Sequence, residues 1–102
     1  MNYRQRNWVK INLDNLKHNF LQIREIVPKD TKILAVVKAD GYGCGSVRVA
    51  NTLIDAGADF LAVAFTDEGI VLRNAGIDKR ILILGNTDES LVEDLFKYNI
   101  TP

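Results

Sequence analysis

Lys38 is the residue of this sequence that is best placed for chemistry. It ends a run of apolar residues, 33–37, and three glycines at alternate positions follow it, Gly41, Gly43 and Gly45. Ammonium groups are rarely buried without a partner. We therefore expect Lys38 either to pair with a carboxylate or to use its amine.

The residues alone leave two interpretations of Lys38 open. Removal from water disfavours the charged form of a lysine, and the neutral amine attacks an aldehyde to form a Schiff base. Enzymes that use pyridoxal phosphate hold the cofactor on such a lysine and later use it to move protons. The alternative is a lysine whose stem covers the strand end while its ammonium stays in water.

The glycine-rich loop after Lys38 would let the backbone approach a ligand closely. It runs into a helix expected to begin at Ser46, whose N-terminus favours an anion. The loop does not match the dinucleotide fingerprint, and a P-loop would have its lysine after the glycines. Within the loop, Tyr42 could donate a hydrogen bond to a phosphate, or it could simply cover the end of the sheet.

We assign no chemistry to the other polar candidates. Cys44 is the only cysteine and has no histidine near it in sequence, and His18 lies off the apolar stripe of its helix. Negative charge at Asp67 and Glu68 suits the start of a helix. The remaining pair, Lys79 and Arg80, precedes a strand and is expected to be solvated. We expect no metal site, because a single cysteine cannot supply the several thiolates of a Cys-based zinc site.

The elements that must position Lys38 alternate between apolar strands and amphipathic helices. Buried strands are expected at 33–37, 60–64 and 81–84, and a strand with one exposed face at 8–12. Helices are expected after N-cap residues, which are Asn12, Ser46, Thr66 and either Thr87 or Asp88. Ile100 begins a further extended segment.

Three strand–helix units predict an α/β fold with a parallel sheet whose strands are buried on both faces. Active sites of such folds lie at the carboxyl ends of the strands, where Lys38 stands. A barrel needs eight units, and three apolar strands alone would leave edges and a face uncovered. We therefore expect the sequence to be the amino-terminal piece of a longer chain.

Composition excludes several classes of function. The 102 residues suffice for one small domain, and 13 basic residues balance 13 acidic ones. We therefore expect no nucleic-acid or membrane partner. We expect no signal peptide, because the amino-terminal segment is polar and has no apolar core, and we expect no transmembrane segment, because no apolar stretch is long enough. One cysteine fits a reducing cytoplasm.

The stretch 37–45, VKADGYGCG, resembles the pyridoxal phosphate attachment motif of the alanine racemase family. The opening 8–19, the segment 61–64 with Glu68, and the segments 72–77 and 81–85 are similar to further parts of that family, in the same order. The resemblance implies that residues 13–102 form the first part of a (β/α)₈ TIM-type barrel that binds pyridoxal phosphate. It also implies that residues 1–12 belong to a second, β-rich domain.

The resemblance also implies roles for individual residues. Lys38 would carry the cofactor and act as the base on one face of the substrate, and Tyr42 would contact the cofactor phosphate. Cys44 stands where many members have histidine, at a position that belongs to the loop. The second base of the family is a tyrosine of the partner subunit, and neither it nor the arginine at the pyridine nitrogen is among these residues.

The function implied is therefore the interconversion of L- and D-alanine for peptidoglycan synthesis, in a homodimeric parent protein. Alone, these residues would hold one base and are expected to be inactive. Two alternative functions also involve pyridoxal phosphate: a non-catalytic pyridoxal phosphate-binding barrel, or a racemase for another amino acid such as serine. A third is a small nucleotide- or phosphate-binding α/β module in which Lys38 is incidental.

Overall fold

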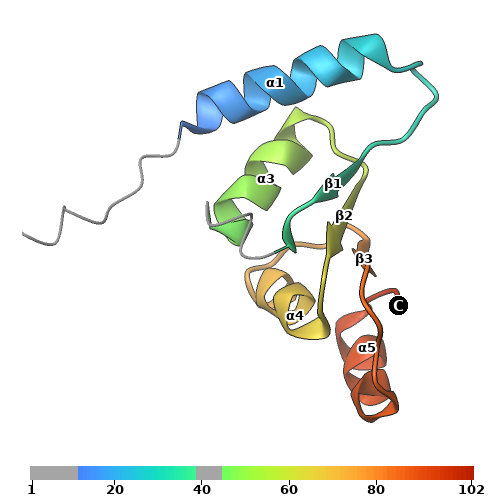
Figure 1. The fold of residues 1–102 in the computed structure, drawn as a ribbon. Helices are drawn as coiled ribbons and strands as arrows, with labels where there is room; N and C mark the ends of the chain where they lie inside the picture. The colour runs from blue at the N-terminus through green and yellow to red at the C-terminus, as the bar shows by residue number, and fades with distance from the viewer. Residues whose placement is uncertain (1–11, 39–44) are drawn as a thin grey trace, which may run out of the picture.

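The computed structural model of the chain describes residues 12–38 and 45–102. Helices and strands alternate through these residues (Figure 1). In order they are α1 (Leu13–Ile26), β1 (Leu34–Val36), α3 (Ser46–Ala56), β2 (Phe60–Val63), α4 (Thr66–Asn74), β3 (Ile81–Ile83), the 3-10 turn η2 (Glu89–Leu91) and α5 (Val92–Tyr98).

The three described strands form one parallel sheet in the order β1-β2-β3. Ala62, in the middle strand, lies opposite Val36 on one side and Leu82 on the other. Thr101 begins to extend the sheet beyond β3, because it forms a parallel bridge with Leu82. The predicted α/β fold with about three strand–helix units is therefore confirmed. The predicted strand at 8–12 lies outside the described residues except for Asn12.

Several helix boundaries follow the sequence signals. The Asn12 side chain accepts a hydrogen bond of 3.1 Å from the Asn15 amide at the start of α1. The Asp88 side chain does the same for the Ser90 amide before α5, at 3.2 Å. Gly57 ends α3 with a φ of +116°, a conformation that suits glycine.

Two predicted N-caps are wrong by one residue. The structure places Gly45 and Phe65 at the N-cap positions, and Ser46 and Thr66 are the first helical residues. Both are buried, so they pack against the core as part of the first turn. At α4 an oxygen acceptor still reaches the cap, but it comes from Glu68, three residues after Phe65.

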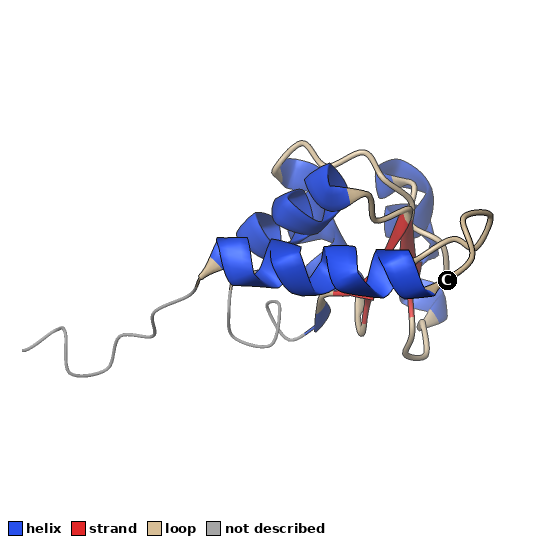
Figure 2. Cartoon of the chain, turned by 90° about the horizontal axis from the view of Figure 1, so that it is seen from above, coloured by secondary structure: helices blue, strands red, loops and turns tan. Residues whose placement is uncertain are grey.

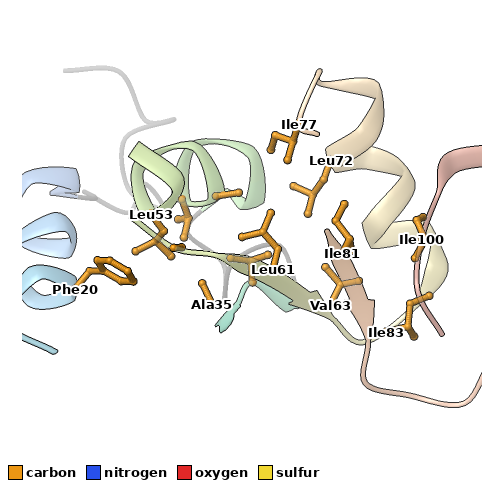
Figure 3. Close-up of a cluster of buried hydrophobic side chains, with 14 of the residues drawn as sticks. Phe20, Ala35, Leu53, Leu61, Val63, Leu72, Ile77, Ile81, Ile83 and Ile100 are labelled. Carbon is orange, nitrogen blue, oxygen red and sulfur yellow. The ribbon is translucent and has the colours of Figure 1, made fainter. Parts of the chain in front are cut away.

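The hydrophobic core lies between the sheet and the helices (Figure 3). Every second strand residue enters it, and side chains from α1, α3, α4 and α5 close it. The members labelled in Figure 3 are Phe20, Ala35, Leu53, Leu61, Val63, Leu72, Ile77, Ile81, Ile83 and Ile100.

The opposite face of the sheet is partly open. Leu34 is 39% exposed and Leu84 is 49% exposed, although Ala62 between them is fully buried. The prediction of strands buried on both faces is therefore confirmed for β2, where 61–63 are fully buried, and wrong for β1, where Leu34 is exposed. An uncovered face was expected of three strands alone. Figure 2 views the same elements from above, with α1 in front of the strands.

The first helix contacts the rest of the fold mainly through α3. The sequence predicts an apolar stripe on this helix that includes Leu16, Phe20 and Ile23. Phe20 is buried and Leu16 packs against the core, whereas Ile23 is 51% exposed. Ile23 instead borders an apolar groove that runs along β1 and includes Leu34. No helix of the described residues is long and apolar enough to cross a membrane.

Candidate functional site

Lys38 lies at the carboxyl end of β1, as predicted. The preceding Val37 is fully buried, and its amide donates a 2.8 Å hydrogen bond to the Ala62 carbonyl. This bond continues the sheet to the residue before Lys38, which is itself half-buried. Within residues 12–38 and 45–102, the Lys38 ammonium has no hydrogen-bond or ion-pair partner. No carboxylate among the described residues therefore forms an ion pair with Lys38.

Two other residues follow neighbouring strands at the same end of the sheet as Lys38. Val36, Ala62 and Leu82 lie in one row across the sheet. Two residues beyond them lie Lys38, Ala64 and Leu84, which follow the ends of β1, β2 and β3, with Lys38 already in a helical turn. We call these three residues the Lys38 row. Ala64 is small and half-buried, and Leu84 is exposed.

The backbone of Ala64 is held from two sides. Its amide and that of Phe65 donate to the same oxygen of Glu68, Oε1, at 2.8 and 3.0 Å. Its carbonyl accepts a 3.1 Å hydrogen bond from the Gly85 amide. Hydrogen bonds to a carboxylate are stronger than those between neutral groups, so the end of β2 is firmly fixed.

Gly85 has a steric reason to be glycine. A Cβ atom built at this position would lie 2.6 Å from the Ala64 carbonyl oxygen, far inside a normal contact. The loop after β3 therefore rests directly on the end of β2. The neighbouring Leu84 amide also bonds to β2, at 2.8 Å from the Val63 carbonyl.

Other residues singled out in the sequence lie elsewhere. Tyr42 and Cys44 fall outside the described residues, and His18 is exposed on α1. Lys79 and Arg80 lie at the amino end of β3, where their carbonyls accept hydrogen bonds from Arg73 and from β2. Among the described residues, no group of three His, Cys, Asp or Glu side chains could hold a metal ion.

Glu68 is the site residue that the sequence analysis missed. It was interpreted as a charge that suits a helix start, whereas its carboxylate bonds the amides at the end of β2. The available signal was its spacing. A glutamate three residues after an N-cap reaches back to the cap amide, which requires the cap to be Phe65. Placing the cap at Thr66 hid this pattern.

Comparison with known proteins follows the same elements. The family profile described as "Alanine racemase, N-terminal domain" matches residues 11–102. The alanine racemase 2 of Bacillus subtilis (strain 168) is 51% identical over 94 residues, which cover 92% of this chain and 24% of that protein. This chain thus spans about a quarter of the length of the curated relatives it matches.

Solved structures share the fold of this region. A crystal structure of alanine racemase from Bacillus anthracis with bound L-Ala-P superposes with a TM-score of 0.89 at 42% identity. The match covers 91% of this chain and 24% of that one. A histidine racemase from Leuconostoc mesenteroides subsp. sake gives a TM-score of 0.79 at 32% identity, over 86% of this chain and 23% of that one.

Proposed function

Because this chain belongs to the alanine racemase N-terminal domain family, we propose that it forms the part of an alanine racemase that supplies the cofactor lysine, Lys38. The observation that carries the proposal is the position of Lys38. It stands half-buried at the carboxyl end of β1, without a charge partner among the described residues. The parent protein would interconvert L- and D-alanine.

The residues of the site fit pyridoxal phosphate. A primary amine is the group that bonds covalently to the cofactor aldehyde. Ala64, after the neighbouring strand, is small, and Leu84 offers an exposed apolar side chain at the same edge. From the motif that resembles the family, we propose that the Tyr42 hydroxyl contacts the cofactor phosphate.

Lys38 would have two duties in the reaction. When bound, pyridoxal phosphate withdraws electrons from the α-carbon of an amino acid, so that the hydrogen there becomes acidic. Lys38 Nζ holds the cofactor before substrate arrives, and it then removes or returns that proton on one face of the α-carbon. Racemisation also needs a proton donor on the opposite face. We propose that a tyrosine of the partner subunit supplies it, in a homodimer that serves peptidoglycan synthesis in the cytoplasm.

We also propose that residues 1–12 begin the β-rich domain and that residues 13–102 begin the barrel. The match of the family profile from residue 11 onward agrees with the second part. The strand predicted at 8–12 would then join the β-rich domain, which a single-barrel cofactor carrier lacks. This strand favours the racemase over the carrier.

The identity of the amino acid needs a separate test. A histidine racemase shares the fold of this region at 32% identity, so these residues support a racemase more directly than they support alanine. Racemisation of alanine, serine and histidine by the full-length protein should be compared by kcat/KM. We expect alanine to be preferred. A preference for serine or histidine would change the substrate, and no turnover with any amino acid would favour the carrier.

Borohydride reduction followed by peptide mapping tests the cofactor lysine. In the full-length protein loaded with pyridoxal phosphate, we expect the reduced pyridoxyl group on Lys38. Lys38→Arg should abolish the label, since arginine keeps the charge but not the reactive amine. Lys32→Arg is the matched control and should leave the label in place, because Lys32 is exposed in the loop before β1. A label on Lys32, or on no lysine, would overturn the assignment.

A further inference from the structure

The carboxyl end of β2 depends on a single side chain from the following helix. The Ala64 and Phe65 amides lie where β2 has ended and α4 has not yet supplied hydrogen bonds of its own. Both donate to Glu68 Oε1, at 2.8 and 3.0 Å. Charged acceptors give the stronger class of hydrogen bond, and both donors would otherwise need water.

The same peptide unit is also the support of the neighbouring loop. Gly85 donates to the Ala64 carbonyl, and there is no room for a Cβ atom between the two residues. Packed backbone segments of this kind move together, because interiors are close-packed. A shift of Ala64 would therefore carry Leu84 and Gly85 with it.

We infer that Glu68 is a positioning residue for the cofactor site, because it fixes Ala64 at the centre of the Lys38 row. Ala64 follows the middle strand, β2, whereas Lys38 and Leu84 follow its two neighbours, β1 and β3. Glu68 does not need to touch cofactor or substrate for this role. It sets how far the other two members of the row stand apart at the edge where the cofactor would bind. The inference rests on the proposed function, since it assumes that Lys38 carries pyridoxal phosphate.

The test compares Glu68→Ala with Glu68→Gln in the full-length protein. Alanine removes the acceptor, whereas the glutamine amide oxygen can accept the same hydrogen bonds. We expect Glu68→Ala to weaken pyridoxal phosphate binding to the apo-protein by about tenfold, the worth of one charged hydrogen bond. We expect Glu68→Gln to restore affinity to within about threefold of wild type. Glu93→Ala is the matched control, because Glu93 is exposed in the first turn of α5.

Three readouts separate positioning from a purely structural role. Cofactor affinity of the apo-protein is measured by titration, the cofactor's bond to Lys38 by its absorbance, and overall stability by the melting temperature of the apo-protein. Positioning predicts a weaker affinity and an altered absorbance in Glu68→Ala, with rescue by glutamine. A lower melting temperature with unchanged affinity and absorbance would overturn it, as would equal effects of alanine and glutamine.

Gly85→Ala provides a second route if Glu68→Ala does not fold. The added Cβ would press on the Ala64 carbonyl from the opposite side. We expect a loss of cofactor affinity similar to that of Glu68→Ala, and unchanged affinity in a folded Gly85→Ala protein would contradict the coupling. Wild-type labelling of Lys38 is checked first. Its failure would refute the proposed function, whereas normal labelling with insensitive variants would refute only the role of Glu68.

Discussion

Replacing Arg73 by methionine should destabilise the amino-terminal side of the sheet without weakening cofactor binding. The half-buried guanidinium donates to four backbone carbonyls around the ends of α4 and α5. The bonds run from Nε to Tyr98 at 2.7 Å, from Nη1 to Ile77 at 2.8 Å and Lys79 at 2.7 Å, and from Nη2 to Asn99 at 2.9 Å. Arg73 thus joins two helix ends and the loop before β3.

The expected size of the effect follows from these contacts. A hydrogen bond from a charged donor contributes about 1.5–3 kcal/mol, but the four bonds share one group and water can replace the exposed one at Asn99. We therefore expect Arg73→Met to cost about 3 kcal/mol. Arg73→Lys should cost about 2 kcal/mol, because one ammonium cannot reproduce the planar fork. Burial lowers the pKa of Arg73, against an opposing effect of Asp78, but the group stays charged at neutral pH.

Hydrogen exchange measures this loss where it occurs. In the full-length protein, a loss of about 3 kcal/mol should speed exchange of peptides covering 77–83 and 98–102 by roughly 100-fold. A peptide covering 46–56 should change less. Arg48→Met is the matched control, because Arg48 is exposed on α3 and makes no hydrogen bond with the described residues. Unchanged exchange in Arg73→Met, or an equal effect in the control, would refute the reasoning.

Two further predictions concern pH and the isolated chain. The hydrogen bond from the Ile33 amide lowers the pKa of Asp59; burial opposes this effect and nearby basic side chains add to it. The Asp59 carboxylate therefore stabilises the fold at pH values above the usual aspartate pKa. This stabilisation is lost as the pH falls through the lowered pKa. Urea unfolding should therefore show Asp59→Asn less stable than wild type near pH 7 and a smaller difference near pH 3. Residues 1–102 expressed alone should aggregate or pack loosely and show no racemase activity, because apolar residues such as Phe96, 83% exposed, lack cover. A cooperative melt from a monodisperse monomer, or measurable turnover, would contradict this.

The fold could be predicted because strand and helix signals in this sequence agree with one another. Short apolar runs such as 60–64 and 81–84 cannot be told from buried helices by period alone, but the capping residues and glycines between them settle the alternation. Asn12, Gly57 and Asp88 each mark a boundary that the structure confirms. The cap of α4 could not be predicted in this way, because Phe65 has no oxygen to act as a cap and its partner is Glu68.

The site was only partly predictable. Lys38 could be placed because a lysine directly after an apolar run must lie at a strand end, and a parallel sheet brings strand ends to one edge. Its neighbours Ala64 and Leu84 required the register between strands, which depends on backbone pairing that no local pattern specifies. The roles of Lys38 and Tyr42 remain predictions from resemblance, and Tyr42 lies outside the described residues.

Charged side chains have different roles at the amino and carboxyl ends of the strands, which we call the amino and carboxyl edges of the sheet. At the amino edge, Arg73 binds four carbonyls, and Asp59 accepts the Ile33 amide at 2.8 Å beside Arg24 at 3.7 Å. Each of these groups satisfies backbone atoms at the ends of helices and strands, and each is expected to affect stability. At the carboxyl edge Glu68 also satisfies backbone amides, but the peptide it holds adjoins an amine that has no charge partner in the described residues. The same kind of contact should therefore alter cofactor affinity when Glu68 changes and leave it intact when Arg73 changes.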